Sequence, residues 1–292
     1  MRVLVTGAAG QLGGDLARAL TAAGHTPIAT DVHGDPSSAL DITDPDGVAA
    51  ALDAHGPDAL VNCAAWTKVD AAEGDPDGAH RLNAVGPRVL AGACHRAGVL
   101  LLHVSTDFVF GDVPPAPVDE WTVPAPLGVY GRSKLAGEEE VRRLCPRHLM
   151  VRTAWLYGRK GPNFVLTMLR LARERGALTV VADQVGSPTW TGHLAPALVR
   201  LLERDVPGTY HLTNAGAVSW HGFAEAIVAA AGVPVPVRPI TTADYPTPAR
   251  RPPYSVLDNR AWRLLGESPL PAWEEGLRSY LAELGEAAAP TG

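Results

Sequence analysis

The chain has 292 residues, enough for one large domain or two modest ones. Its hydrophobic share of 46% and charged share of 19% are ordinary for a globular protein and exclude a disordered chain. No apolar run reaches the roughly 18 residues of a membrane span, and a net charge of −6 disfavours nucleic-acid binding. The sequence opens on an apolar run and a glycine-rich turn, without the pattern of a signal or transit peptide, so we expect a cytoplasmic protein.

Strand and helix signals alternate through the first half of the chain. Short apolar or β-branched runs predict buried strands, and apolar residues three or four apart predict helices between them. The expected strands are Val3–Thr6, Thr26–Thr30, Ala59–Ala64, Leu100–Ser105 and Leu149–Thr153. The expected helices are Leu12–Ala23, Asp46–Ala54, Arg81–Ala97 and Tyr130–Leu144. This alternation predicts the α/β class, with a Rossmann-type, doubly wound parallel sheet over residues 1–153 and helices on both of its faces.

The alternation is less regular after about residue 155. The expected helices are Phe164–Arg175, Gly192–Glu203, Trp220–Ala231 and Trp273–Leu284, and the expected strands are Thr179–Ala182 and Thr209–Leu212. Prolines between residues 234 and 253 predict an ordered loop without regular structure. We expect residues 154–292 to form largely a smaller, mixed, substrate-binding lobe, with returns to the nucleotide-binding domain near 163–182 and 207–213.

A glycine-rich turn joins the first expected strand to the first expected helix. It contains Gly7, Gly10 and Gly13 in the spacing GxxGxxG, with Gln11 and Leu12 opening the helix. Glycine lets the backbone approach a pyrophosphate, and a helix N-terminus offers unpaired N–H groups and positive dipole character. A glycine pattern alone is weak evidence, but its place between strand and helix predicts a dinucleotide site.

The end of the second expected strand carries Asp31. A carboxylate there accepts hydrogen bonds from the adenosine ribose, which favours NADH and repels the 2′-phosphate of NADPH. His33 follows and is able to face such a phosphate. Asp41 and Ile42, after the next short apolar segment, are expected to flank the adenine ring.

Tyr130 and Lys134 are four residues apart, on one face of an expected helix. A neighbouring ammonium favours the phenolate, so we expect Lys134 to lower the pKa of Tyr130 toward neutrality and to hold the nicotinamide ribose. Thr106, at the end of an earlier strand, supplies a hydroxyl that can polarise a carbonyl. Together with the glycine turn, these residues predict a catalytic set of Thr106, Tyr130 and Lys134.

Metal and disulfide chemistry find little support in the sequence. The three cysteines, Cys63, Cys94 and Cys145, are widely spaced and odd in number, which suits buried thiols in a reducing compartment. The histidines form no cluster with ligand spacing, and no acidic cluster is assigned to magnesium. We therefore assign no metal ligands.

Eight runs of the sequence carry a resemblance that spans residue 3 to about residue 260. They are VLVTGAAGQLGGDL, VNCAAWTKVDAAE, LNAVGPRVLA, VSTDFVFGD, YGRSKLAGE, RTAWLYG, DQVGSPTWT and RPPYSVLDNR. The chain resembles the extended short-chain dehydrogenase/reductase superfamily and, within it, the dTDP-4-dehydrorhamnose reductase family. The first and fifth runs are common to the superfamily, whereas DQVGSPT, RTAWLYG and RPPYSVLD are specific to this family.

The resemblance implies reduction of the 4-keto group of dTDP-4-dehydro-6-deoxy-L-hexose, giving dTDP-L-rhamnose, with NADPH as cofactor and NADH also accepted. Tyr130 would donate the proton, and Thr106 would hydrogen-bond the carbonyl oxygen. Trp155 would lie along the sugar, and Arg250 or Arg251 would meet the dTDP pyrophosphate. The remaining implied contacts are Val69 and Asp107 to the substrate, and Ala64, Ala65 and Thr67 to the nicotinamide side.

Departures from the family pattern leave alternatives open. Phe108 stands where the family often has tyrosine, which removes a hydroxyl near the sugar pocket and fits a related dTDP-deoxysugar 4-ketoreductase of an antibiotic pathway, of the dihydrostreptose type. A nucleotide-sugar epimerase shares the glycine turn and the Tyr/Lys pair. A non-catalytic regulatory relative is expected to have lost part of the Thr/Tyr/Lys set. The family includes monomers and metal-assisted dimers, so a homodimer also stays open.

Overall fold

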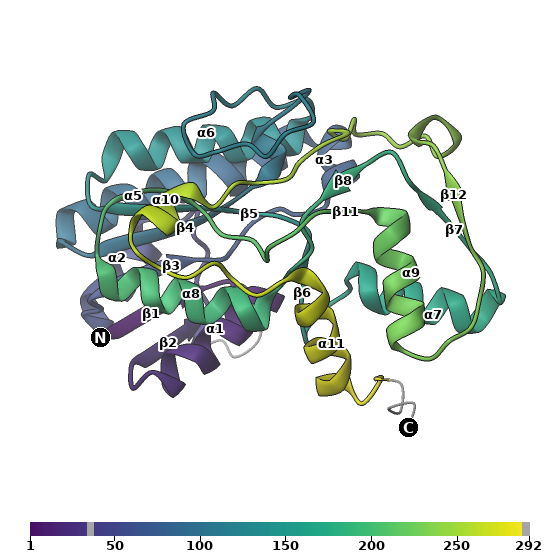
Figure 1. Cartoon of the computed structure of the whole chain (residues 1–292). Helices are drawn as coiled ribbons and strands as arrows, with labels where there is room; N and C mark the ends of the chain where they lie inside the picture. Colours follow the sequence, from purple (N-terminus) through teal and green to yellow (C-terminus); the bar gives the residue numbers. More distant parts are fainter. Residues whose placement is uncertain (34–37, 288–292) are drawn as a thin grey trace.

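The computed structural model describes residues 1–33 and 38–287 and is built on a six-stranded parallel sheet (Figure 1). The strand order is β10-β5-β4-β3-β1-β2. The strands are β1 (Arg2–Thr6), β2 (Thr26–Thr30), β3 (Ala59–Asn62), β4 (Leu100–Thr106), β5 (His148–Thr153) and β10 (Gly208–His211). The chain runs outward from β1 to β2 and then crosses to β3 on the other side of β1. Ligands of such sheets bind at this reversal, beyond the carboxyl ends of the strands.

Helices cover both faces of the sheet because each strand follows the previous one through a crossover (Figure 1). One face packs against α1 (Gln11–Ala22) and α8 (Thr191–Arg204), in an apolar core that Trp262 of α10 (Arg260–Leu264) also joins. The other face packs against α2 (Pro45–His55), α5 (Gly86–Ala97) and α6 (Val129–Leu144). The four central strands, β1, β3, β4 and β5, are mostly buried, which explains their largely apolar sequences.

The helix expected at Arg81–Ala97 begins earlier and is not regular. After the short helix α3 (Val69–Gly74), α4 (Pro76–His80) leads into a π-helical turn at Arg81–Val85, and α5 continues from Gly86. The side chain of Asn83 in this turn accepts a hydrogen bond from the backbone N–H of Trp66 (2.8 Å) and donates one to the Ser133 hydroxyl (3.0 Å). Single-turn π bulges are frequent at functional sites, and this one lies against α6.

The second lobe has its own apolar core and small sheets. Helices α7 (Phe164–Arg175), α9 (Trp220–Ala230) and α11 (Trp273–Leu284) pack around Tyr157 and Phe223. Figure 1 shows α7 and α9 beside a pair of strands set apart from the main sheet, β7 (Leu178–Val181) and β12 (Val237–Ile240). Two shorter pairs complete the lobe: β6 (Leu156–Tyr157) with β9 (Thr189–Trp190), and β8 (Val185–Gly186) with β11 (Val218–Ser219).

Two expectations for the second half are wrong. The segment 163–182 does not return to the main sheet, because β7 pairs with β12, whereas β10 does lie at the edge of that sheet, beside β5. The proline-rich stretch 234–253 is not free of regular structure, since it contains β12 and a short 3₁₀ turn at Thr242–Asp244. Pro239 is tolerated inside β12 because a strand with one neighbour leaves half of its N–H positions unused. No helix of the described residues is long and apolar enough to cross a membrane.

Gly13 allows α1 to start directly against the glycine turn. A Cβ at this position would clash with the Gly7 carbonyl oxygen and would lie 2.8 Å from Ala8 Cα. We therefore expect Gly13→Ala to lower the free energy of unfolding by about 1–3 kcal/mol, the usual cost of overpacking. Urea denaturation of the purified protein measures this.

Gly92→Ala is the matched control for Gly13→Ala. Gly92 lies inside α5, and a methyl group added there would have an Arg96 side-chain atom as its nearest neighbour, 3.4 Å away. The free energy of unfolding of this variant should stay unchanged or rise by about 0.5–1 kcal/mol, because alanine is the better helix former. Equal effects of the two substitutions would contradict the close contact at Gly13.

Candidate active site

A cleft of about 820 Å³ opens beyond the carboxyl ends of β1, β3 and β4, where the two lobes meet. Most of the residues expected to bind cofactor or substrate line this one cleft. They are Gly7, Gly10, Gln11, Leu12, Asp31, Ile42, Ala64, Ala65, Thr67, Val69, Thr106, Asp107, Tyr130, Lys134, Trp155 and Arg251. The fold thus brings together positions that are up to 244 residues apart in the sequence (251 minus 7).

Three expected site residues lie outside the cleft lining. Gly13 lies in the first turn of α1, where the absence of a Cβ allows the close contact with Gly7 and Ala8 described above. The Asp41 Oδ1 atom accepts hydrogen bonds from the backbone N–H and the hydroxyl of Thr43, both 2.8 Å away. Arg250 is exposed and forms an ion pair with Asp112 (2.6 Å).

The glycine turn forms a cradle with the properties that a dinucleotide pyrophosphate requires. Gly7 has a φ of +68°, and a Cβ there would lie 2.7 Å from the backbone nitrogen of Ala64. Gly10 caps α1 without any side-chain hydrogen bond, so the first-turn N–H groups keep their capacity to bind an anion. The Gln11 Oε1 atom is buried and has no hydrogen-bond partner among the described residues. These features fit a nicotinamide dinucleotide.

Asp31 lies beside this cradle and is held by backbone groups. Its Oδ2 atom accepts a hydrogen bond from the N–H of Ala9 (3.0 Å), and its Oδ1 atom accepts one from the N–H of His33 (3.0 Å). A carboxylate has about four lone-pair positions, so two remain for a ribose. Val32 and His33 line the same end of the cleft.

The expected proton donor lies in a buried row of polar groups at the end of β4. The Thr106 hydroxyl donates to Asp107 Oδ1 (3.0 Å) and accepts from the backbone N–H of Phe108 (3.2 Å). Burial raises the pKa of Tyr130 to about 12, against the effect of its hydrogen bond with Thr106. Burial also raises the pKa of Asp107 to about 6. The Tyr130 ring is held by an edge-to-face contact with Phe108, with centroids 5.6 Å apart.

The expectation that Lys134 brings the pKa of Tyr130 toward neutrality is wrong for this structure. The Lys134 ammonium donates to the Val104 carbonyl oxygen (2.7 Å) rather than to the phenol, and it lies near His103. Its own burial lowers the pKa of Lys134 to about 8, against the attraction of Glu138. Removal from water is therefore the largest effect on the pKa of both groups. It keeps the phenol in the protonated form that a proton donor needs.

Trp155 lines the cleft in an unusual backbone conformation. Its φ of +48° is rare for a bulky residue. Its ring stacks on Trp220, with centroids 3.4 Å apart and planes 3° from parallel. A Cβ at Gly186 would lie 2.6 Å from two of its ring atoms. The indole is thus packed closely against Trp220 and Gly186 while the residue lines the cleft.

Trp220 and Lys160 are among the lining residues that were not predicted from the sequence. Trp220 comes from the start of α9 and stacks on Trp155. Lys160 follows β6, and its side chain passes within 3.2 Å of the position that a Cβ on Gly14 would take, near the start of α1. The Gly-Arg-Lys-Gly stretch after RTAWLYG was the available signal for Lys160, since it combines a cation with flexible backbone. Arg251 lines the cleft while forming an ion pair with Asp70 (2.7 Å).

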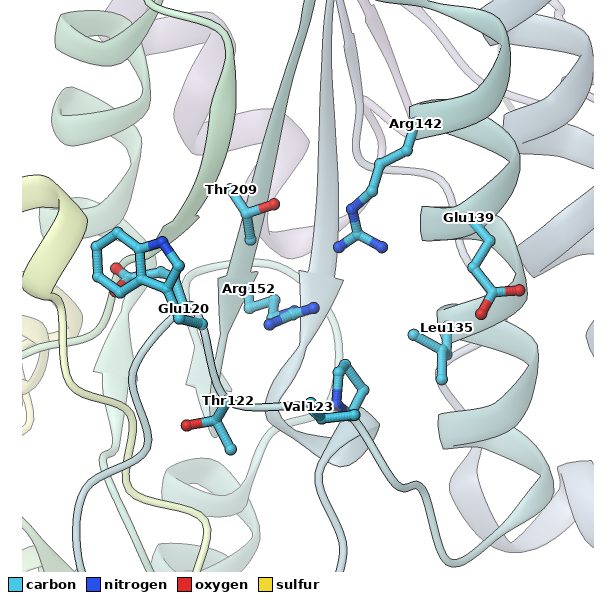
Figure 2. A pocket seen from close by; sticks show the side chains of 10 residues that line it. Glu120, Thr122, Val123, Leu135, Glu139, Arg142, Arg152 and Thr209 are labelled. Atoms are coloured by element: carbon cyan, nitrogen blue, oxygen red, sulfur yellow. The ribbon is translucent and has the colours of Figure 1, made fainter.

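An ion-pair network joins α6 to β5. Figure 2 shows Arg142 and Arg152 at a second cavity, of about 370 Å³, between α6 and the outer strands of the sheet. Both arginines donate to Glu138, Arg152 through two hydrogen bonds of 2.9 and 2.7 Å and Arg142 through one of 2.6 Å. The guanidinium of Arg152 also lies 5.0 Å from the centre of the Phe110 ring. The buried Glu138 carboxylate is therefore paired with two cations, the buried Arg152 and the partly exposed Arg142.

Comparison with known proteins agrees with this geometry. The family model described as "RmlD substrate binding domain" matches residues 1–286. The dTDP-4-dehydrorhamnose reductase of Mycolicibacterium smegmatis is 46% identical, over 96% of this chain and 85% of its own. A crystal structure of dTDP-4-dehydrorhamnose reductase from Bacillus anthracis in complex with NADP is 41% identical, with a TM-score of 0.93, and covers 97% of this chain and 99% of that chain.

A third relative bears on the sugar. A Streptomyces antibioticus protein named probable dTDP-4,6-dihydroxy-2-methyloxan-3-one 4-ketoreductase is 43% identical, over 97% of this chain and 96% of its own. The Rossmann-type α/β fold and the resemblance inferred from the sequence motifs are confirmed. The chain belongs to the dTDP-4-dehydrorhamnose reductase family of nicotinamide-dependent oxidoreductases.

Proposed function

We propose that the protein reduces the 4-keto group of dTDP-4-dehydro-6-deoxy-L-hexose to give dTDP-L-rhamnose. NADPH is the proposed reductant, and NADH is also accepted. The observation that carries the proposal is the placement of Thr106, Tyr130 and Lys134 in the same cleft as the glycine cradle. The Bacillus anthracis relative with bound NADP supports the choice of cofactor.

The residues of the cleft supply the proton and the electrostatic part of the reaction. When bound, the reduced nicotinamide supplies the hydride. The hydroxyls of Thr106 and Tyr130 hydrogen-bond the carbonyl oxygen, and Tyr130 donates its proton as negative charge develops there. Its raised pKa keeps this proton in place at neutral pH. The Lys134 ammonium, one helical turn away, stabilises the phenolate that remains.

The two lobes divide the ligands between them in this proposal. Residues 1–153 hold the dinucleotide: the glycine cradle takes the pyrophosphate, Asp31 the adenosine ribose, Ile42 the adenine, and Ala64, Ala65 and Thr67 the nicotinamide side. Residues from 154 onward close over the sugar nucleotide together with Val69 and Asp107. Arg251 meets its pyrophosphate, and Arg250, which is exposed and paired with Asp112, is the weaker candidate. The three free thiols suit action in the reducing cytoplasm.

A related dTDP-deoxysugar 4-ketoreductase activity is the second candidate function. Phe108 lines the cleft beside Tyr130 without the hydroxyl that the family often has there, and the Streptomyces antibioticus relative is named for such a reaction. The complete Thr/Tyr/Lys set opposes a non-catalytic role. Incubating the protein with NADPH, NADH and each dTDP-4-keto-sugar, followed by identification of the product, distinguishes these candidates from each other and from an epimerase, which consumes no reductant.

Tyr130→Phe should lower turnover by roughly 10²–10⁴-fold, the usual contribution of a positioned proton donor. Cofactor affinity should stay near normal, because the ring keeps its edge-to-face contact with Phe108. Tyr157→Phe is the matched control, since this tyrosine is buried in the second-lobe core and its hydroxyl has no hydrogen-bond partner among the described residues. Steady-state kinetics measure both variants, and normal turnover of Tyr130→Phe would overturn the mechanism.

Asp31→Ala should shift the ratio of kcat/KM values toward NADPH, because the carboxylate repels a 2′-phosphate and binds a free ribose hydroxyl. The expected shift is about tenfold, equivalent to 1.4 kcal/mol. Asp53→Ala, on the exposed side of α2, removes the same charge away from the cleft and should leave the ratio unchanged. A shift toward NADH, or none, would show that Asp31 does not contact the ribose.

Trp155→Ala should mainly raise the KM for the sugar nucleotide, since the residue lines the cleft but carries no reacting proton. Trp220→Ala should act in the same direction because it removes the stack that orients Trp155. Trp121→Ala is the control: this indole is 61% exposed and lies outside the cleft. If both cleft variants lose thermal stability while KM stays at the wild-type value, the two indoles serve only the core.

A further inference from the structure

A buried polar cluster lies beneath the candidate active site and surrounds the catalytic lysine. It consists of Asn62 at the end of β3, His103 in β4 and Lys134 in α6, each at most 2% exposed, and the mechanism above uses only the lysine. Asn62 Nδ2 is 2.9 Å from His103 Nδ1, and His103 Nε2 is 3.5 Å from Lys134 Nζ. The lysine therefore faces an imidazole on the side away from the cleft.

The orientation of the Asn62 amide is fixed by a backbone donor. Its Oδ1 atom lies 3.1 Å from the backbone nitrogen of Ala64 and 2.7 Å from the Thr6 hydroxyl. The backbone N–H of Ala64 can only donate, so the amide oxygen must face it. The NH₂ group is then directed at His103 Nδ1, where it also can only donate.

This contact determines which nitrogen of His103 carries the proton. Burial, followed by the nearby Lys134 charge, holds the pKa of His103 well below its usual value, so the imidazole is neutral. A neutral imidazole has one N–H. Since Nδ1 accepts from Asn62, the hydrogen is on Nε2, and this N–H is directed at Lys134. The lone pair of an amine accepts it, whereas an ammonium has no lone pair to do so.

We propose that Asn62 and His103 are positioning residues that favour the neutral amine of Lys134 and so set the pH at which this lysine loses its charge. The assignment of the histidine tautomer and the effect on Lys134 rest on contacts within the protein alone. Their consequence for catalysis rests on the proposed function: an uncharged lysine no longer stabilises the Tyr130 phenolate, so activity should fall as the pH rises through the titration of Lys134.

Other groups around Lys134 and His103 act on the same equilibrium. Glu138, one turn further along α6, favours the ammonium, and burial favours the amine. The Cys63 thiol after β3 stays protonated, because burial raises its pKa to about 12. The charged or titratable groups that act on His103, besides Lys134, are His148 and Arg142. Tyr130 and Asp107 line the cleft together with Lys134, and Asp107 acts on Tyr130.

The direct test uses the protein without ligands. Two-bond ¹H–¹⁵N spectra of histidine-labelled protein distinguish the Nε2–H tautomer, the Nδ1–H tautomer and imidazolium, and His103→Gln identifies the His103 signal. We expect the Nε2–H tautomer at neutral pH. The Nδ1–H tautomer or an imidazolium would overturn the proposal whether or not any variant folds.

A second measurement follows the charge of Lys134. The chain has only three lysines, Lys68, Lys134 and Lys160, and the other two are exposed, so ¹³Cε-labelled lysine gives three assignable titration curves. In Asn62→Asp, one carboxylate oxygen still accepts from the backbone N–H of Ala64. The other oxygen replaces the NH₂ group, so it accepts a hydrogen bond from His103 instead of donating one. The histidine hydrogen then moves to Nδ1, and Nε2 accepts from the ammonium. We expect the Lys134 midpoint to rise by at least about one pH unit.

A double-variant control separates the tautomer from the added charge. In a His103→Phe background, Asn62→Asp introduces the same carboxylate but the imidazole is absent. Any rise in the Lys134 midpoint that remains is therefore the direct effect of the added negative charge. Most of the rise should disappear. An equal rise in both backgrounds would overturn the proposal.

The pH profile of kcat/KM then tests the catalytic consequence. The alkaline limb should move upward in Asn62→Asp together with the Lys134 midpoint. If the midpoint moves and the limb does not, the tautomer assignment stands and the role given to the Lys134 charge in the reaction is wrong. If the protein reduces no dTDP-4-keto-sugar at all, the proposed function fails while both spectroscopic results remain valid.

Discussion

The close packing of α6 against the end of β4 is the constraint on which the candidate site depends. Two glycines on this helix make it possible: a Cβ on Gly131 would clash with the Phe108 carbonyl oxygen, and one on Gly137 would clash with the Asn83 carbonyl oxygen of the π-helical turn. At this short separation, Tyr130, Lys134 and Glu138 are all taken out of water. They lie four residues apart and so share one face of the helix. The helix therefore positions the three groups and, by burying them, changes their acidity.

Burial would make this arrangement costly if its charges were not matched. An unpaired buried carboxylate costs several kcal/mol, whereas a paired one is tolerated. Burial alone would raise the pKa of Glu138, but the hydrogen bonds and charges of Arg152 and Arg142 hold it below its usual value. The resulting anion partly compensates the Lys134 ammonium one turn away. The ion-pair network that joins α6 to β5 is thus the reason that a lysine can remain charged near neutral pH beneath an apolar cleft.

The sequence predicted the sheet domain well because its signals are local. Each buried strand is a continuous apolar run, and the glycine turn is recognisable from its spacing and its place. The pairing of β7 with β12 was missed because it joins segments that are distant in sequence, and Pro239 argued against a strand that in fact has a free side. Asp41 lies outside the cleft lining although Ile42 is part of it, and its Asx turn to Thr43 is a local contact that the sequence did not reveal.

The acidity of Tyr130 and Lys134 could not be read from their spacing, because it depends on what surrounds them. Spacing placed the two side chains on one face, but the strand that passes beneath them supplies the Val104 carbonyl, which accepts a hydrogen bond from the ammonium. A favourable pair at four-residue spacing is worth only a few tenths of a kcal/mol on a solvated helix. Desolvation is worth several times more, so the environment determines the outcome.

Trp155 shows how the two lobes are held in register across the cleft. The residue follows β5 and turns the chain into the second lobe at a φ of +48°, a conformation that costs a bulky residue of order 1–3 kcal/mol. Stacking on Trp220 and contact with Gly186 bind the indole to two elements of that lobe, and the Trp155 carbonyl accepts the N–H of Thr189 at 3.2 Å. An aromatic pair contributes about 0.5–1.5 kcal/mol beyond its buried area, comparable with the strain. The contacts of Trp155 with the second lobe therefore offset the strain of the turn, and the same residue that joins the two lobes lines the cleft between them.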